Sequence, residues 1–139
     1  MQRRAILATL GLVGTVGTAG CLTRITNAGE PYDIGMSANA FEPYRFTVDP
    51  GETVVWLNNG SRAHTVTAYG RGIPDGTSFF ATGNFANEDE ARAAWHDHRG
   101  GNIYASERFS HTFTEPGRYP YFCVPHELGG MLGEIVVSD

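Results

Sequence analysis

Lysine is absent from this chain of 139 residues, so all ten of its basic residues are arginines. Fifteen acidic residues outnumber them and give a formal net charge of −5 at pH 7. A nucleic-acid-binding protein usually carries a basic stripe; none is present here, and we expect no nucleic-acid partner. The loss of lysine together with an acidic balance indicates a salt-adapted organism or a GC-rich genome, although compositional drift without function explains it equally well.

Cysteine is scarce too, since the chain has only Cys21 and Cys123. The two could in principle form one disulfide. Their settings differ, however: Cys21 closes an apolar leader, whereas Cys123 lies inside a dense group of metal-binding residue types. A disulfide would consume the thiolate that a metal site needs. We therefore predict that the two cysteines serve different purposes and are not bonded to each other.

The chain also lacks an apolar run as long as the ~20 residues that a membrane-spanning helix needs. Its leader, residues 1–20, has an Arg3-Arg4 pair followed by a glycine-rich apolar run, which predicts a secretory signal. The arginine pair resembles a twin-arginine export signal. The residues before Cys21 resemble a lipoprotein box, with Thr18 where leucine is usual. We predict that Cys21 is lipidated and anchors the chain outside the cytoplasm, on the outer face of the cell membrane; the alternative is an uncleaved N-terminal anchor.

The rest of the chain is predicted to be a tether over residues 21–31 and one domain over residues 32–139. Short strand candidates alternate with turn residues, which indicates an all-β sandwich. These candidates lie at residues 46–48, 53–57, 64–68, 108–114, 119–124 and 132–137. Residues 70–102 are instead a loop-like excursion from the sandwich, with one helix predicted at 88–95 and capped by Asn87.

Three potential metal ligands, Cys123, His126 and Met131, lie within nine residues, in a loop between two strand candidates. A thiolate and imidazoles in a trigonal arrangement, with a weak axial thioether, define an electron-transfer copper site. The flanking strands place Cys123 and Met131 at the same end of the sandwich. Zinc would suit the cysteine and histidine, but a methionine ligand does not suit zinc. The spacing therefore predicts a site for one copper ion.

A second imidazole must come from elsewhere, and His64 is the best candidate because it lies in phase with apolar residues of its strand candidate and directly follows a turn. Taken singly, an inward histidine is more often structural, and a buried cysteine or methionine is more often core filler. Their co-occurrence is what predicts a metal site. His96 and His98 lie in a polar, glycine-flanked stretch and His111 in a strand candidate, and we expect none of these three to touch the metal.

The segment GRYPYFCVPH at residues 117–126, followed by Met131 and Gly133, closely resembles the copper-binding end of plastocyanins, pseudoazurins and halocyanins. Upstream residues resemble the same proteins, namely Ala40 to Pro43, Phe46, Pro50-Gly51, Val54, Trp56, Asn58-Asn59 and His64. The resemblance covers about residues 32–68 and 109–137. It implies a cupredoxin-like Greek-key β-sandwich and a copper ion held by His64, Cys123, His126 and Met131.

One position departs from the resemblance. These proteins commonly have asparagine directly after the first ligand histidine, where it braces the loops around the sulfur, but this chain has Thr65. The bracing bond is therefore expected to be weaker or rearranged. The arginine pair, the cysteine box and the lack of lysine favour the halocyanin branch, a membrane-tethered haloarchaeal type.

The resemblance implies a monomeric blue (type 1) copper protein that carries single electrons by cycling Cu(I)/Cu(II) between membrane-associated complexes of a respiratory chain, through transient contacts. The alternative is an extracytoplasmic copper chaperone or storage protein without redox duty, but three methionines in the whole chain leave no methionine-rich motif. An enzyme is not expected, because a filled four-ligand site has no open position for a substrate.

Overall fold

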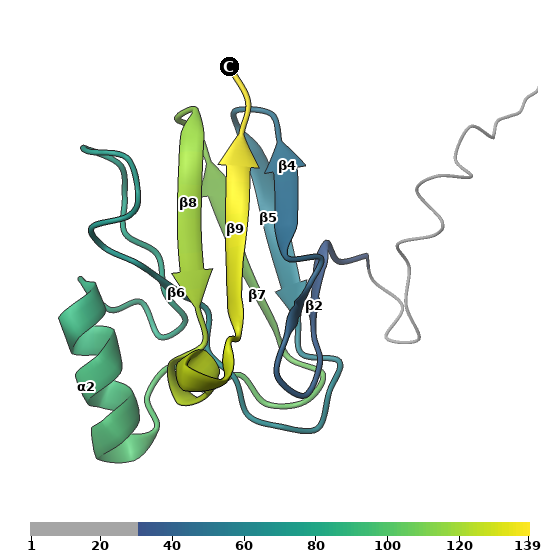
Figure 1. Cartoon of the computed structure of the whole chain (residues 1–139), viewed down its shortest axis with the longest axis vertical. Helices are drawn as coiled ribbons and strands as arrows, with labels where there is room; N and C mark the ends of the chain where they lie inside the picture. The colour runs from purple at the N-terminus through teal and green to yellow at the C-terminus, as the bar shows by residue number, and fades with distance from the viewer. Residues whose placement is uncertain (1–30) are drawn as a thin grey trace, which may run out of the picture. The chain divides into compact units, whose positions relative to one another are not determined.

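The protein, as seen in a computed structural model, is described over residues 31–139, and its domain is a sandwich of two four-stranded sheets (Figure 1). The predicted signal, the lipidation site Cys21 and nearly all of the predicted tether lie outside the described residues. The first sheet has the order β3-β2-β5-β7, made of Phe41–Glu42, Ile34–Met36, Glu52–Leu57 and Arg108–Phe113. The second has the order β4-β9-β8-β6, made of Arg45–Val48, Leu132–Val137, Gly117–Phe122 and Thr67–Ala68. The predicted all-β sandwich is confirmed.

The core lies between the two sheets and is rich in aromatic rings. Trp56 of β5 is fully buried, and its ring meets that of Tyr121 of β8 at 5.4 Å and 90°. Burying such a side chain stabilises the fold by about 1.5–3 kcal/mol, and aromatic pairs add about 0.5–1.5 kcal/mol. A close-packed core of this kind deforms little, so the ends of its strands are firm supports for a site.

The β8–β9 hairpin brings two predicted ligands together. The two strands pair antiparallel, with Phe122 opposite Leu132, and the loop between them contains a short 3-10 helix, η1 (Val124–Gly129). Cys123 therefore directly follows β8 and Met131 directly precedes β9. Their backbones also bond, because the Cys123 N–H donates to the Met131 carbonyl at 3.1 Å. The strand predicted at residues 119–124 ends earlier, at Phe122, because Pro125 and the turn of η1 end the ladder.

The strand predicted at residues 64–68 is shorter than expected. Only Thr67–Ala68 forms a strand, while His64 makes an isolated bridge with Ile103. The backbone of Val66 pairs instead with Thr82, whose N–H donates to the Val66 carbonyl at 2.8 Å. Residues from the 70–102 excursion thus take hydrogen bonds that a neighbouring strand would otherwise make.

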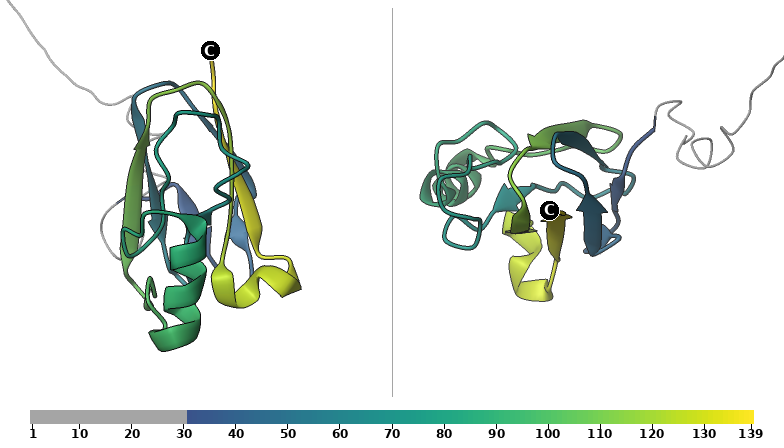
Figure 2. Two further views of the ribbon diagram at one scale, coloured as in Figure 1. Left: turned by 90° about the vertical axis from the view of Figure 1, so that its left-hand side faces the viewer. Right: turned by 90° about the horizontal axis from the view of Figure 1, so that it is seen from above.

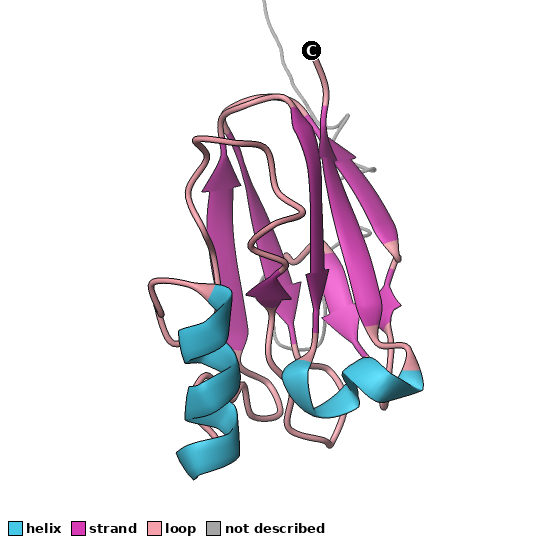
Figure 3. Ribbon diagram, turned by 60° about the vertical axis from the view of Figure 1, so that its left-hand side comes forward, coloured by secondary structure: helices cyan, strands magenta, loops and turns pink. Residues whose placement is uncertain are grey.

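The excursion contains the predicted helix, α2, which spans Glu88–His98 and is three residues longer than expected. The Asn87 side chain accepts a hydrogen bond from the Glu90 N–H at 2.9 Å, which confirms the predicted cap. The helix ends where Arg99 adopts a left-handed conformation, with φ of 60°. Figures 2 and 3 show α2 beside η1, at the same end of the sandwich. Within residues 31–139, no helix is both long and apolar enough to cross a membrane.

Candidate metal centre

Three of the four predicted ligands meet at the end of the sandwich where β8 and β9 are joined. The ligand atoms of His64, Cys123 and His126 all lie within 4.8 Å of one another. The Cys123 Sγ is 3.7 Å from the Nδ1 of His64 and 3.4 Å from the Nδ1 of His126. Both imidazoles therefore present the same ring nitrogen to the sulfur, so two nitrogens and one sulfur converge as a trigonal donor set.

Burial separates the four candidate residues into two groups. His64, Cys123 and Met131 are completely buried, whereas His126 is half-buried. Met131 belongs to the same core cluster as Cys123, and its N–H donates to the His126 carbonyl at 3.1 Å. His126 is thus the one candidate ligand through which this part of the chain reaches solvent.

Thr65 braces the loops around the sulfur through both its hydroxyl and its backbone. Its hydroxyl accepts a hydrogen bond from the Val124 N–H at 2.8 Å, and its own N–H points at the Cys123 Sγ at 3.4 Å. The hydroxyl also lies 3.1 Å from that of Thr67, so it is held from a second side. A threonine hydroxyl thus ties the His64 segment to the start of η1, where the resembling proteins commonly have asparagine.

The electrostatics of the site suit a metal cation. Burial raises the pKa of the Cys123 thiol to about 11, although the Thr65 N–H works against this rise. Burial also lowers the pKa of His64, helped by the neighbouring His126, and lowers the pKa of His126, helped by Arg62. Metals bind neutral imidazole and thiolate, so the lowered histidine pKa values favour the ligand form, and a bound cation would supply the charge that the buried thiolate needs.

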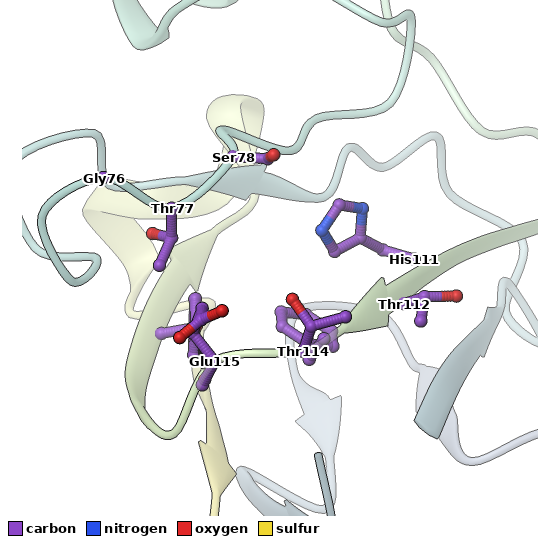
Figure 4. Close-up of a pocket in the computed structure, with 9 residues that line it drawn as sticks. Gly76, Thr77, Ser78, His111, Thr112, Thr114 and Glu115 are labelled. Atoms are coloured by element: carbon purple, nitrogen blue, oxygen red, sulfur yellow. Dashed lines mark hydrogen bonds between the residues drawn. The ribbon is translucent and has the colours of Figure 1, made fainter. Parts of the chain in front are cut away.

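The other three histidines stay away from this cluster, as predicted. His96 and His98 are exposed on α2, and His98 lies 3.2 Å from the Asp97 carboxylate. His111 stacks on Phe80 at 4.9 Å and lines a separate small pocket (Figure 4). In that view the His111 ring points toward the segment that carries Thr77 and Ser78, which belongs to the excursion.

Comparison with known proteins decides the family. Residues 32–138 match the sequence model of the copper binding proteins, plastocyanin/azurin family. The chain belongs to that family. A plastocyanin from Scenedesmus fuscus is 34% identical over 101 residues, which cover 73% of this chain and 89% of that protein. A chloroplastic plastocyanin from Chlamydomonas reinhardtii is 30% identical over 129 residues, covering 91% of this chain and 79% of the relative.

Solved structures agree with this assignment to the plastocyanin/azurin family. A pseudoazurin from Sinorhizobium aligns with a TM-score of 0.53 and 27% identity, over 78% of this chain and 73% of that one. An amicyanin from Paracoccus versutus aligns with a TM-score of 0.50 and 26% identity, over 76% and 78%. The family and the converging donor set together identify the end of the sandwich as a type 1 copper site formed by His64, Cys123, His126 and Met131. The predicted blue-copper cupredoxin is thereby confirmed, while the halocyanin branch stays a prediction.

Sequence reasoning missed the contacts that connect the excursion to this copper site. Glu127, the residue after His126, accepts hydrogen bonds from Arg92 of α2 and from the hydroxyl of Tyr69. Arg92 holds the pKa of the Glu127 carboxyl below its usual range. No spacing rule joins residues 69, 92 and 127, and only the fold brings them together.

Proposed function

We propose that this chain carries single electrons between membrane-associated redox complexes on the outer face of the cell membrane, and that it catalyses no reaction of its own. Bound copper supplies the Cu(I)/Cu(II) couple. The observation that carries the proposal is the buried donor set with a single half-exposed ligand, found in a chain of the plastocyanin/azurin family. The proposed membrane attachment rests on the sequence alone, through the predicted signal and the lipidation of Cys21.

The four site residues have distinct proposed roles. His64 and His126 would hold the metal through Nδ1, Cys123 through its sulfur, and Met131 would add a weak thioether ligand. The thiolate and thioether suit Cu(I), while the imidazoles are acceptable to both oxidation states. Because three of these residues are fixed in a close-packed core, we expect them to move little between the two states, which favours fast electron transfer.

Electrons are proposed to leave through His126. Leu128, two residues further along η1, is the most exposed large hydrophobic side chain within residues 31–139 and is entirely accessible. Gly129 and Gly130 beside it are exposed as well. An apolar residue next to the half-exposed ligand suits a small, transient contact with a redox protein, which gives brief encounters and fast release. We propose that the carrier works as a monomer.

Replacing Leu128 with aspartate tests this route. We expect Leu128→Asp to slow electron self-exchange between Cu(I) and Cu(II) copies, because the new charge must be desolvated and faces a like charge on the other copy. The visible spectrum should not change, since Leu128 is no ligand. The measurement is the self-exchange rate from NMR line broadening in mixtures of the two oxidation states.

A matched control adds the same charge at the other end of the sandwich. Thr114 is exposed and lies between the end of β7 and the start of β8, opposite η1. Thr114→Asp should leave self-exchange close to the wild-type rate. Equal slowing by both variants would show that the effect comes only from the added net charge. An unchanged self-exchange rate in Leu128→Asp would contradict the proposal that electrons leave through His126. Failure of wild-type protein to cycle reversibly between Cu(I) and Cu(II) would end the carrier proposal itself.

A further inference from the structure

One side chain of the excursion at residues 70–102, that of Arg92, contacts the chain neighbours of two copper ligands. Its guanidinium makes a bidentate salt bridge with Glu127, with distances of 2.7 Å and 3.1 Å to the two carboxylate oxygens. It also lies 4.3 Å above the ring of Phe122. Glu127 follows His126 and Phe122 precedes Cys123, so Arg92 touches the backbone neighbour of each.

Arg92 is itself held in place from several sides. Its Nε donates to Glu88 at 2.8 Å, one turn earlier on α2, and Glu88 also accepts the Gly70 N–H at 2.9 Å. The Tyr69 hydroxyl donates to the same Glu127 carboxylate at 2.6 Å. The ring of Tyr69 stacks on Phe122 with centroids 4.4 Å apart. We call Tyr69, Glu88, Arg92 and Glu127 the Arg92 clamp.

Val124 of η1 packs with Trp95 and Phe122, but few hydrogen bonds tie the loop that this clamp contacts to the rest of the described domain. Hydrogen bonds that tie η1 to parts of residues 31–139 outside the ligand loop come from two of its residues: Val124, which donates to Thr65, and Glu127, which binds the clamp. Its remaining hydrogen bonds stay between residues 123 and 131. A short 3-10 helix has poor internal hydrogen-bond geometry, so on its own it would hold His126 loosely. Gly130, at its end, has φ of 94° and adds no side chain.

We propose that Arg92 is a positioning residue for the copper site: through Glu127 it fixes η1, and with η1 the half-exposed ligand His126. Bidentate arginine–carboxylate pairs supply directional specificity as well as energy, which suits an orienting role. Partly exposed ion pairs contribute little to global stability, so stabilising the whole domain is a poor explanation for this arrangement. The inference rests on the copper site and not on the redox partners, so it can fail while the carrier proposal stands.

The experiment compares Arg92→Met with Arg99→Met. Arg99 caps the same helix, its guanidinium lies 5.0 Å from the Trp95 ring and it is exposed, so its loss removes the same charge without touching η1. We expect Arg92→Met to raise the rate of Cu(I) release to an excess of a Cu(I) chelator by about 10-fold or more, the usual effect of losing a residue that orients a metal ligand. Arg99→Met should release Cu(I) at the wild-type rate.

Three further tests separate positioning from general destabilisation. In metal-free protein, the amides of His126, Gly130 and Met131 should lose hydrogen-exchange protection in Arg92→Met but not in Arg99→Met. The double variant Arg92→Met/Glu127→Gln should release Cu(I) no faster than Arg92→Met alone, because both changes break one contact. Arg92→Lys keeps the charge but loses the bidentate geometry, so its rate of Cu(I) release should lie between those of wild type and Arg92→Met. The proposal would be overturned if Arg92→Met released Cu(I) and exchanged its amides at the wild-type rates. It would also be overturned if the effects of Arg92→Met and Glu127→Gln on Cu(I) release were additive.

Discussion

His126→Gly is expected to abolish fast electron self-exchange and the blue colour, and added imidazole is expected to restore both. His126 is the half-exposed ligand, so its removal opens a hole from solvent to the donor set. A free imidazole can enter that hole and place a nitrogen where Nδ1 of His126 had been, because Cys123 and His64 still hold their places in the core. The measurement is visible absorption and NMR self-exchange, each with and without imidazole.

His64→Gly is the matched control for this experiment. It deletes the same side chain, but His64 is completely buried and its backbone is bridged to Ile103, directly after the excursion. Added imidazole would have to cross packed side chains, so we expect it not to restore the blue band. Recovery in both variants would mean that the two histidines are equally accessible. Recovery in neither would mean that His126 does more than supply a nitrogen.

Phe80→Ala is expected to destabilise the domain by about 3–5 kcal/mol, the usual cost of deleting a buried phenylalanine. Phe80 belongs to the excursion, yet it is only 3% exposed and packs inside the sandwich. Its ring lies 5.2 Å from that of Phe113 and 6.3 Å from that of Trp56. The change would leave a cavity between the excursion and the first sheet. Urea denaturation of the metal-free protein measures the effect.

Tyr104→Ala provides the comparison, because Tyr104 is an aromatic residue that follows the excursion closely but is 62% exposed. We expect it to change the free energy of unfolding by no more than about 0.5 kcal/mol, as is usual for surface positions. If Phe80→Ala cost as little as Tyr104→Ala, the excursion would be an appendage of the sandwich and not part of its core.

Local patterns were sufficient to predict most of the sandwich. The strand at Leu132–Val137 has the predicted bounds, and those at Glu52–Leu57 and Arg108–Phe113 differ by one residue. Alternating apolar residues, bounded by turns, act over a few residues and are visible in one sequence. The ligand loop could also be predicted from the sequence, because cysteine, histidine and methionine must be close in sequence to lie in one hairpin loop.

What the sequence did not reveal depends on contacts between distant residues. The segment from His64 to Val66 has the alternation of a strand, but its partners are Ile103 and Thr82, which lie 39 and 16 positions further along the chain. Nothing in the local pattern indicates that an excursion would fold back there. The Arg92 clamp could not be predicted from the sequence for the same reason, since Arg92 and Glu127 are 35 positions apart. Long-range pairing is decided by the whole fold and not by local propensity.

The visible absorption spectrum of the domain at residues 32–139, titrated with Cu(II), tests the central claim most directly, with Cys123→Ser measured alongside. A thiolate in the donor set predicts an intense blue band that saturates at one copper per chain, disappears on reduction and is lost in Cys123→Ser. A pale spectrum that the substitution leaves unchanged would contradict the claim, because Cys123 would then not be a ligand and the protein could not be a type 1 copper electron carrier.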